Sequence, residues 1–468
     1  MGILDFFPPG MTPREGQRDI LLAVEAAWHK SDIFVITAPV GAGKSAIAAT
    51  IAEWRRAAGQ TNSLIVPNNL LLDQYARSFP RLPMMRRRRL YQCAPMGNSC
   101  ADQEICCRGV CPYTKAKRLT RAAGVRAATY HGYVAHRMHS DVLIADEAHR
   151  LVELLRATGD VTIRRSKFAF PDTLVTQEDL ISWLQYEMQR RDDPALKKVL
   201  ADVQRINLAG ALEFKDVHTG KKFDRHLTLR AVTGASAGRL LWPSSVRKIV
   251  LMSATIGPKD VDEMGLGMRR ATYLTCASPI DPLKRPIRYE PTANMALKYR
   301  QFSAPLLATK IEELLGRYPD KGLVHVPYDV AKLLRLYLSN SRLLWHDKKD
   351  KSEVFNEFLA SSPEQGKVLV ASGMYEGIDL PYDAARWQVI GVVPFLPLGE
   401  KWVRERADKD PEWYAWSAVK QVAQASGRVV RSEDDYGVTV ITDTQFERVH
   451  RNHRQLFPKF FIEAMIGA

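Results

Sequence analysis

Residues 38–45 read APVGAGKS and directly follow an apolar run, IFVIT, at residues 33–37. A strand that enters a glycine-rich loop and continues into an alanine-rich helix, here AIAATIAEWRRA at residues 46–57, predicts a phosphate-binding loop at a helix N-terminus. The loop N–H groups would surround phosphate oxygens, Lys44 would reach the terminal phosphates and the Ser45 hydroxyl would bind Mg²⁺. The residues expected to bind ATP here are Ala38, Gly41, Ala42, Gly43, Lys44 and Ser45.

A second apolar run, DVLIA at residues 141–145, carries the sequence DEAH at its C-terminal end. Open α/β sheets bind ligands at that end of their strands. Asp146 would share the Mg²⁺ ion with Ser45, and Glu147 would orient and deprotonate the attacking water. We therefore expect Lys44, Asp146 and Glu147 to form the catalytic centre of an ATPase, with His149 coupling the nucleotide state to neighbouring motifs.

The second half of the chain repeats the α/β pattern. Apolar runs at residues 321–326 (KGLVHV) and 367–371 (KVLVA) alternate with helical stretches at residues 330–338 and 351–359. Such alternation predicts a second parallel sheet. We expect residues 277–286 to link the two halves.

Two further segments of this half carry candidate functional residues. GMYEGIDLP occupies residues 373–381, and QASGRVVR occupies residues 424–431 within an expected helix over residues 413–431. Residues 394–410, which precede that helix, are expected to form a surface connection. On the helix Gln424, Arg428 and Arg431 would share one face, and the two arginines could stabilise γ-phosphate charge as arginine fingers.

Five cysteines lie within nineteen residues, at positions 93, 100, 106, 107 and 111. The candidate metal ligands are Cys93, Cys100, Cys106 and Cys111, with Cys107 as the alternative to Cys106. Four thiolates suit a [4Fe–4S] cluster or a tetrahedral zinc ion, and the spacing does not choose between them. A disulfide framework is not expected, because the rest of the chain contributes only Cys276.

The order of motifs resembles that of superfamily 2 helicases, and within them the XPD/DinG-like group of iron–sulfur DNA helicases. The matching pieces are RxxQ (Arg14, Gln17), APVGAGKS, VPNNLLLDQ (residues 66–74), the cysteine cluster ending in CPY, DEAH, SAT (residues 253–255), EGIDLP, QASGRVVR and DYG (residues 435–437). The resemblance implies that Arg14, Gln17, Gly377 and Asp379 also contribute to ATP binding. It favours the [4Fe–4S] cluster over zinc.

The resemblance also implies an architecture and an activity. We expect an α/β fold with two RecA-like parallel-sheet motor domains, a cysteine-rich metal-cluster lobe and a small, mainly helical arch-like insertion. The expected segments are residues 1–84, 125–150 and 236–278 for the first motor domain, 85–124 for the lobe, 151–235 for the arch and 279–468 for the second motor domain. Helices are expected at residues 176–189 and 195–206 of the arch. The implied activity is ATP- and Mg²⁺-dependent 5′→3′ translocation on single-stranded DNA with duplex unwinding.

Charge supports a nucleic-acid partner. The formal net charge is +15, and residues 86–126 hold ten Lys/Arg against two acidic residues. Such a segment binds phosphates without reading sequence, although the run at residues 86–89 could also be a solvated face or an import signal. The candidate DNA-binding residues are Arg86, Arg87, Arg88, Arg89, Tyr113, Lys115, Lys117 and Arg118. Tyr91, Tyr113 and Tyr130 could stack on bases, but for any one of them a core or packing role is the favoured interpretation.

Composition limits the remaining possibilities. The chain has 468 residues, 46% of them hydrophobic, without an apolar run of eighteen residues, so we expect several cores and no membrane span. We expect a cytoplasmic monomer that acts on single-stranded and forked DNA and that could act with a protein partner. Two alternatives from other classes remain: a zinc-bearing RNA helicase or remodeller, and an ATP-gated nucleic-acid-binding module recruited to a larger complex without unwinding.

Overall fold

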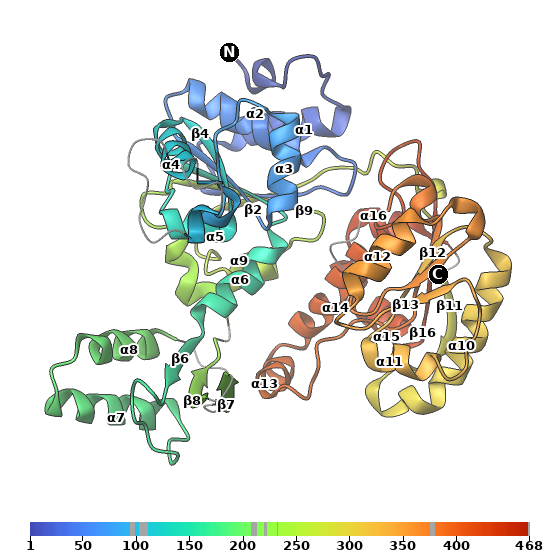
Figure 1. The fold of residues 1–468 in the computed structure, drawn as a ribbon. Helices are drawn as coiled ribbons and strands as arrows, with labels where there is room; N and C mark the ends of the chain where they lie inside the picture. Colours follow the sequence, from blue (N-terminus) through green and yellow to red (C-terminus); the bar gives the residue numbers. More distant parts are fainter. Residues whose placement is uncertain are drawn as a thin grey trace. The chain divides into compact units, whose positions relative to one another are not determined.

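The computed structural model describes residues 1–93, 99–102, 111–206, 213–219, 222–231, 233–374 and 380–466. The chain divides into two compact units (Figure 1). The first unit comprises Met1–Thr37, Gly43–Cys276 and Leu398–Asp408, and the second comprises Ala38–Ala42, Ala277–Pro397 and Lys409–Ala468.

The first unit is built on a seven-stranded sheet in the order β10-β1-β9-β5-β2-β4-β3. Its strands are β1 (Ile33–Thr37), β2 (Asn62–Val66), β3 (Met84–Met85), β4 (Val125–Thr129), β5 (Val142–Asp146), β9 (Lys248–Ser253) and β10 (Ala271–Thr275). All paired strands run parallel. The strands β2, β4 and β5 are buried along their whole length, as expected of a parallel sheet with both faces covered.

Helices connect these strands. They are α1 (Glu15–Ala27), α2 (Lys44–Ala57), α3 (Asn69–Ser78), α4 (Pro112–Ala122), α5 (Tyr130–His136), α6 (His149–Gly159) and α9 (Pro258–Glu263). The predicted strand at residues 33–37 coincides with β1, and the one at residues 141–145 is β5 shifted by one residue. The phosphate-loop and DEAH sequences therefore each follow a strand of this sheet.

The second unit contains another seven-stranded parallel sheet, ordered β13-β14-β12-β15-β16-β11-β17. Its strands are β11 (Ile287–Ala293), β12 (Gly322–His325), β13 (Leu343–Trp345), β14 (Val368–Val370), β15 (Trp387–Ile390), β16 (Val438–Asp443) and β17 (Met465–Ile466). Its helices are α10 (Arg300–Arg317), α11 (Tyr328–Leu334), α12 (Lys351–Ala360), α14 (Pro411–Ser426), α15 (Gln445–His453) and α16 (Lys459–Ala464). The two expected RecA-like sheets are thus confirmed.

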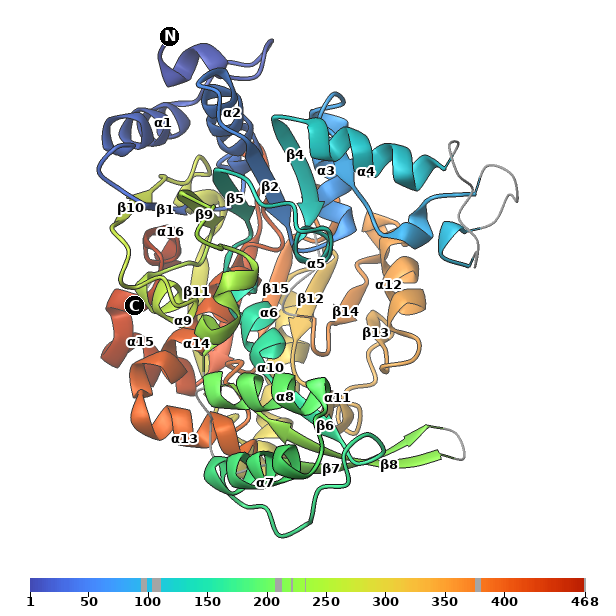
Figure 2. The same cartoon turned by 90° about the vertical axis from the view of Figure 1, so that its left-hand side faces the viewer.

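The insertion of the first unit differs from its prediction. Helices α7 (Gln177–Arg190) and α8 (Pro194–Arg205) occur where helices were expected and lie side by side (Figures 1 and 2). However, the insertion also contains an antiparallel sheet that the sequence pattern does not predict. Its strands are β6 (Val161–Arg164), β8 (Lys222–Leu229) and β7 (Glu213–Thr219). The sequences of β7 and β8, EFKDVHT and KFDRHLTL, carry charged residues throughout, so they lack the apolar alternation that marks a strand.

The prediction that residues 394–410 form a surface connection is wrong. It contains α13 (Lys401–Lys409), a helix that buries Trp402, Val403 and Arg406. Arg406 Nη2 lies 2.9 Å from Glu263 Oε1 of the first unit, and both side chains are almost fully buried. The sequence does not predict this ion pair, because Arg406 and Glu263 are far apart in the chain and residues 394–410 are rich in charged residues. Among the described residues no helix is both long and apolar enough to cross a bilayer.

Candidate nucleotide-binding and motor site

The phosphate-binding loop enters α2 through Gly43. Its φ of 74° lies in the left-handed region, and a Cβ there would stand 2.1 Å from the Gln17 side-chain nitrogen. Only glycine satisfies both conditions. Gln17 Nε2 donates to the Gly43 carbonyl at 3.3 Å, and Gln17 Oε1 accepts from the Arg14 N–H at 3.0 Å. Gln17 therefore contacts the phosphate-binding loop directly, and the Arg14 backbone contacts Gln17; their expected role in ATP binding stays a prediction.

A chain of polar contacts starts at Lys44. Its Nζ lies 3.4 Å from Glu147 Oε1, and Glu147 Oε2 lies 3.4 Å from His149 Nδ1. His149 Nδ1 shares a 2.7 Å hydrogen bond with the Ser253 hydroxyl of the SAT sequence, and that hydroxyl also accepts from the Thr255 N–H at 3.1 Å. The loop, DEAH and SAT sequences are thus linked through side chains. Ser253 appears in the sequence only as part of the SAT motif, and the structure links it to His149.

Glu147 also has an unusual backbone. Its φ of 53° lies in the left-handed region, which is unfavourable for a residue with a side chain. Its N–H donates to Asp146 Oδ1 at 2.9 Å, which helps to hold that conformation. The turn directs the Glu147 carboxylate to Lys44 and His149, the groups between which a water-orienting base would be expected.

Asp146 is 2% exposed at the end of β5. Burial, and next the neighbouring Glu147 charge, raise the pKa of its carboxyl to about 6. A carboxylate whose charge is disfavoured in this way suits a divalent cation, which would compensate that charge. With the Ser45 hydroxyl it offers the oxygen ligands that Mg²⁺ prefers, so the donor set fits the expected ion.

Two buried tyrosines contact Asp146, and the sequence analysis assigned neither of them to this site. The Tyr75 hydroxyl of α3 donates to Asp146 Oδ2 at 2.9 Å, and the Tyr130 hydroxyl donates to the Asp146 carbonyl. Burial raises the pKa of both phenols well above their usual range, so both stay protonated donors. Tyr130 is 2% exposed, so the suggestion that it stacks on a base is wrong.

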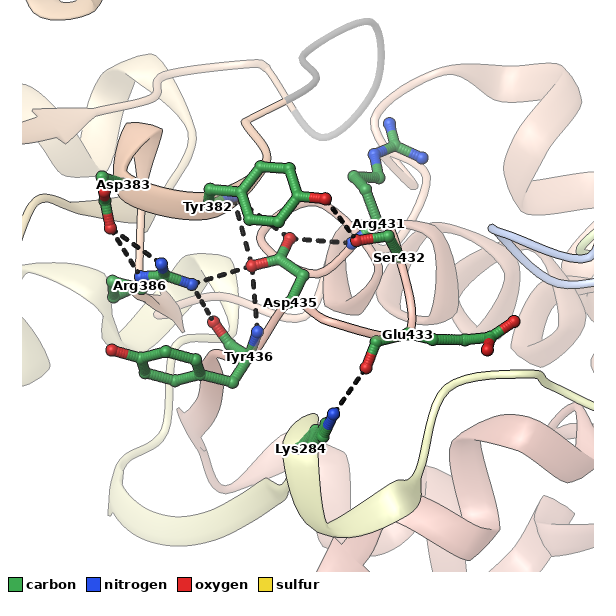
Figure 3. A network of polar contacts seen from close by, with 9 residues as sticks. All are labelled: Lys284, Tyr382, Asp383, Arg386, Arg431, Ser432, Glu433, Asp435 and Tyr436. Carbon is green, nitrogen blue, oxygen red and sulfur yellow. Dashed lines mark hydrogen bonds and ion pairs between the residues drawn. The ribbon is translucent and has the colours of Figure 1, made fainter.

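In the second unit a buried carboxylate, Asp435, organises the loop after QASGRVVR (Figure 3). Its oxygens accept from the N–H groups of Arg431 at 3.1 Å and Tyr436 at 2.9 Å. They also accept from the Tyr382 N–H at 3.1 and 3.2 Å and from Arg386 Nη1 at 2.8 Å. One carboxylate therefore holds the backbone at Arg431 beside the residue that follows EGIDLP.

Further contacts reinforce this loop. Tyr382 has a φ of 55°, and its hydroxyl shares a 2.9 Å hydrogen bond with Ser432 (Figure 3). Arg386 also bonds Asp383 at 2.7 Å, and its guanidinium stacks 4.0 Å from the centre of the Tyr436 ring. The DYG sequence is thus the support of the arginine-bearing loop.

The predicted helix over residues 413–431 is too long. Helix α14 ends at Ser426 with Gly427 as its C-cap. Gln424 lies in its last turn, whereas Arg428 and Arg431 lie beyond the helix, so the three do not share a helical face. Gln388 stabilises the C-terminal end of α14, because its Nε2 donates to the Ala425 carbonyl at 2.8 Å. Gly377 and Asp379 lie outside the described residues.

The cysteine lobe is only partly described. Cys93, Cys100 and Cys111 are buried, and the sulfurs of Cys100 and Cys111 are 3.8 Å apart. The N–H of Thr114, followed by its hydroxyl, lowers the pKa of the Cys111 thiol to about 6. Cys106 and Cys107 lie outside the described residues, and within the described ranges no group of three potential ligands has metal-binding geometry. The cluster stays a prediction.

The basic candidates lie around this lobe. Arg87, Arg88, Arg89, Lys115 and Arg118 are exposed, Lys117 is half-buried, and Arg86 pairs with Asp73 at 2.5 Å. The Tyr113 ring packs 5.6 Å from that of Tyr91 and 6.0 Å from that of His136. Tyr113 therefore has a packing role in the protein, while most of the basic candidates are exposed to solvent.

The fold and the site together show two parallel-sheet units, the first of which carries a phosphate-binding loop beside a buried carboxylate. Family models agree: residues 316–463 match the model described as Helicase C-terminal domain, and residues 10–165 match Type III restriction enzyme, res subunit.

Curated relatives and solved structures narrow the class. The chain is 24% identical over 225 residues to a protein named probable ATP-dependent helicase from Methanocaldococcus jannaschii, a match covering 42% of this chain and 34% of the relative. It is 29% identical over 120 residues to the general transcription and DNA repair factor IIH helicase subunit XPD/RAD3 of Saccharomyces cerevisiae, covering 23% and 15%. A solved XPD helicase superposes with a TM-score of 0.64 at 15% identity over 95% of this chain and 98% of that one. S. tokodaii Xpd4 gives 0.59 at 15% identity over 97% and 100%.

In fold this chain is similar to solved XPD helicases, and parts of its sequence match helicase family models and proteins named as helicases. The alignments with the two curated relatives span about a third or less of those proteins.

Proposed function

We propose that this protein is an ATP-dependent DNA helicase that translocates 5′→3′ on single-stranded DNA. The observation that carries the proposal is the linked set Lys44, Glu147, His149 and Ser253 beside the buried Asp146. This arrangement joins a phosphate-binding loop to a water-orienting carboxylate and to the SAT sequence. A phosphoryl transfer needs positioning and charge compensation of this kind.

Each candidate residue has a role in the proposed cycle. Arg14 and Gln17 support the base side of ATP, and the loop residues Ala38, Gly41, Ala42, Gly43 and Lys44 hold its phosphates. Ser45 and Asp146 would hold Mg²⁺, which when bound offsets phosphate charge. Glu147 orients the water and accepts its proton. Gln424, Arg428, Arg431, Gly377 and Asp379 contribute from the second unit, with the arginines stabilising γ-phosphate charge.

DNA is the proposed substrate, through the exposed cations around the cysteine lobe and the DNA repair role named for the yeast relative. We propose a cytoplasmic monomer acting on single-stranded and forked DNA, with a protein partner where a larger assembly recruits it.

The substrate class is tested by nucleic-acid-stimulated ATP hydrolysis. We expect single-stranded DNA to stimulate turnover, and the stimulation to weaken steeply with salt because phosphate contacts release counterions. The measurement compares steady-state ATPase rates with DNA, with RNA of the same sequence and without nucleic acid. Stimulation by RNA alone would support the RNA-helicase alternative instead.

For the cysteine lobe we propose a [4Fe–4S] cluster held by Cys93, Cys100, Cys111 and either Cys106 or Cys107. The lowered pKa of Cys111 suits a thiolate ligand. Zinc keeps one specific observation in its favour. A Zn–S bond of about 2.3 Å makes the sulfur–sulfur edge of a tetrahedral site about 3.8 Å, which equals the Cys100–Cys111 separation of 3.8 Å. A cubane cluster holds its thiolates further apart, because each binds a different iron.

Metal analysis separates the two ions. We expect protein purified without oxygen to be brown, to contain about four iron atoms per chain, and to lose its visible absorption in Cys111→Ser. Cys276→Ser is the matched control, since Cys276 is buried outside the lobe and its replacement should leave the colour unchanged. Colourless protein with one zinc ion per chain would overturn the iron–sulfur proposal.

A further inference from the structure

Helix α3 places one side chain at the nucleotide site. The Asn68 side chain caps the helix by accepting from the Leu71 N–H at 3.0 Å, which fixes where the helix begins. Leu72 and Tyr75 are the buried residues of α3, and at a spacing of three they share one face. Tyr75 is fully buried, so its hydroxyl needs a partner inside the protein.

The Tyr75 hydroxyl contacts one of the two proposed magnesium ligands directly. It donates to Asp146 Oδ2 at 2.9 Å. The Ser45 side chain lies close enough to the same phenol to affect its pKa, so Tyr75 is near both proposed ligands.

The hydrogen bond from Tyr75 leaves suitable lone pairs on the Asp146 carboxylate. Asp146 accepts from Tyr75 at Oδ2 and from the Glu147 N–H, 2.9 Å away, at Oδ1. Each carboxylate oxygen has further acceptor capacity, and the two hydrogen bonds fix the plane of the carboxylate.

We propose that Tyr75 is a positioning residue for the nucleotide-bound magnesium ion, acting by orienting the Asp146 carboxylate through its hydroxyl. The inference rests on the proposed function, because it takes the ion at this site as Mg²⁺ accompanying a nucleotide. It also gives α3, which continues the VPNNLLLDQ sequence, a direct connection to the nucleotide site.

The test is the gain in nucleotide affinity that magnesium confers, measured with fluorescent N-methylanthraniloyl-ADP in magnesium and again in EDTA. In Tyr75→Phe the ring remains and only the hydroxyl is removed. We expect its affinity in EDTA to match wild type, and the magnesium-dependent gain to fall about tenfold, as for loss of a hydrogen bond to a charged group.

Tyr133→Phe is the matched control. Tyr133 is also fully buried, and its hydroxyl donates to the Leu241 carbonyl at 2.9 Å rather than to Asp146. This variant loses a buried phenol hydrogen bond of similar kind but should keep the wild-type gain. A general loss of stability would affect both variants alike, which thermal unfolding curves would show.

Two results would overturn the inference. One is a wild-type magnesium gain in Tyr75→Phe, which would leave Tyr75 with a packing role only. The other is an equal loss of affinity in EDTA and in magnesium, which would mean that the phenol supports the loop and not the ion. Wild-type protein that binds no nucleotide in either buffer would instead contradict the proposed function itself, and the inference with it.

Discussion

Lys44→Ala is expected to reduce ATP hydrolysis by at least about a hundredfold, comparable to removing one preorganised charge-stabilising donor from an active site. Lys44 begins α2 directly after the loop glycine and lies 3.4 Å from the Glu147 carboxylate. With the lysine removed, no ammonium would remain there to compensate phosphate charge. Steady-state phosphate release, with and without single-stranded DNA, measures the effect.

Loss of folding must be separated from loss of chemistry. Lys44 is nearly buried but packs at a polar site, so circular dichroism and the thermal transition should stay near wild type. Lys30→Ala is the matched control. Lys30 is exposed in the turn after α1, so this variant should keep wild-type turnover. Retained hydrolysis in Lys44→Ala would remove this loop from the proposed mechanism.

Much of the first unit could be predicted because its signals are local. The apolar run of β1, the glycine-rich loop and the alanine-rich α2 are contiguous in the chain, and a left-handed residue at Gly43 is a requirement that sequence displays directly. The apolar runs at residues 321–326 and 367–371 similarly became β12 and β14. These local signals therefore predicted two strands of each sheet, β1 and β5 in the first and β12 and β14 in the second, and the resemblance supplied the rest of the two-sheet architecture.

The remaining parts of the site depend on partners that are far apart in the sequence. Tyr75 contacts Asp146, 71 residues away in the sequence, and Ser253 contacts His149, 104 residues away. Hydrophobic periodicity does not predict contacts between residues so far apart in the sequence. The arginine loop was misjudged for a local reason. QASGRVVR continues the helical pattern, but Gly427 ends α14, and Asp435 then holds the following backbone in a loop. Glycine as a helix stop was the available signal.

The structure also changes how the DYG sequence is understood. It entered as one motif among several, whereas Asp435 supports both Arg431 and Tyr382 by accepting their N–H groups. The role proposed for Arg431 thus depends on a carboxylate that lies four residues further along the sequence. The insertion also buries a small core of its own, although its strands β7 and β8 carry many charged residues. This core includes Leu227 of β8, Leu184 of α7 and Leu196 of α8.

The proposed 5′→3′ direction of translocation predicts an all-or-none difference in strand separation between 5′-tailed and 3′-tailed duplexes. A 5′→3′ motor loads on a 5′ single-stranded tail and moves toward the duplex, whereas on a 3′ tail it moves away from the duplex. We therefore expect ATP-dependent strand separation with the 5′ tail and none with the 3′ tail. Lys44→Ala should separate neither substrate, which excludes a contaminating helicase.

The most direct test of the whole account is this comparison, made with protein purified without oxygen and with duplexes that share one sequence and differ only in the tailed strand. Strand separation from the 5′ tail alone, dependent on ATP and absent in Lys44→Ala, is the result predicted. Separation from the 3′ tail would contradict the proposed direction. ATP hydrolysis without strand separation on either substrate would contradict the helicase activity and favour the recruited nucleic-acid-binding module.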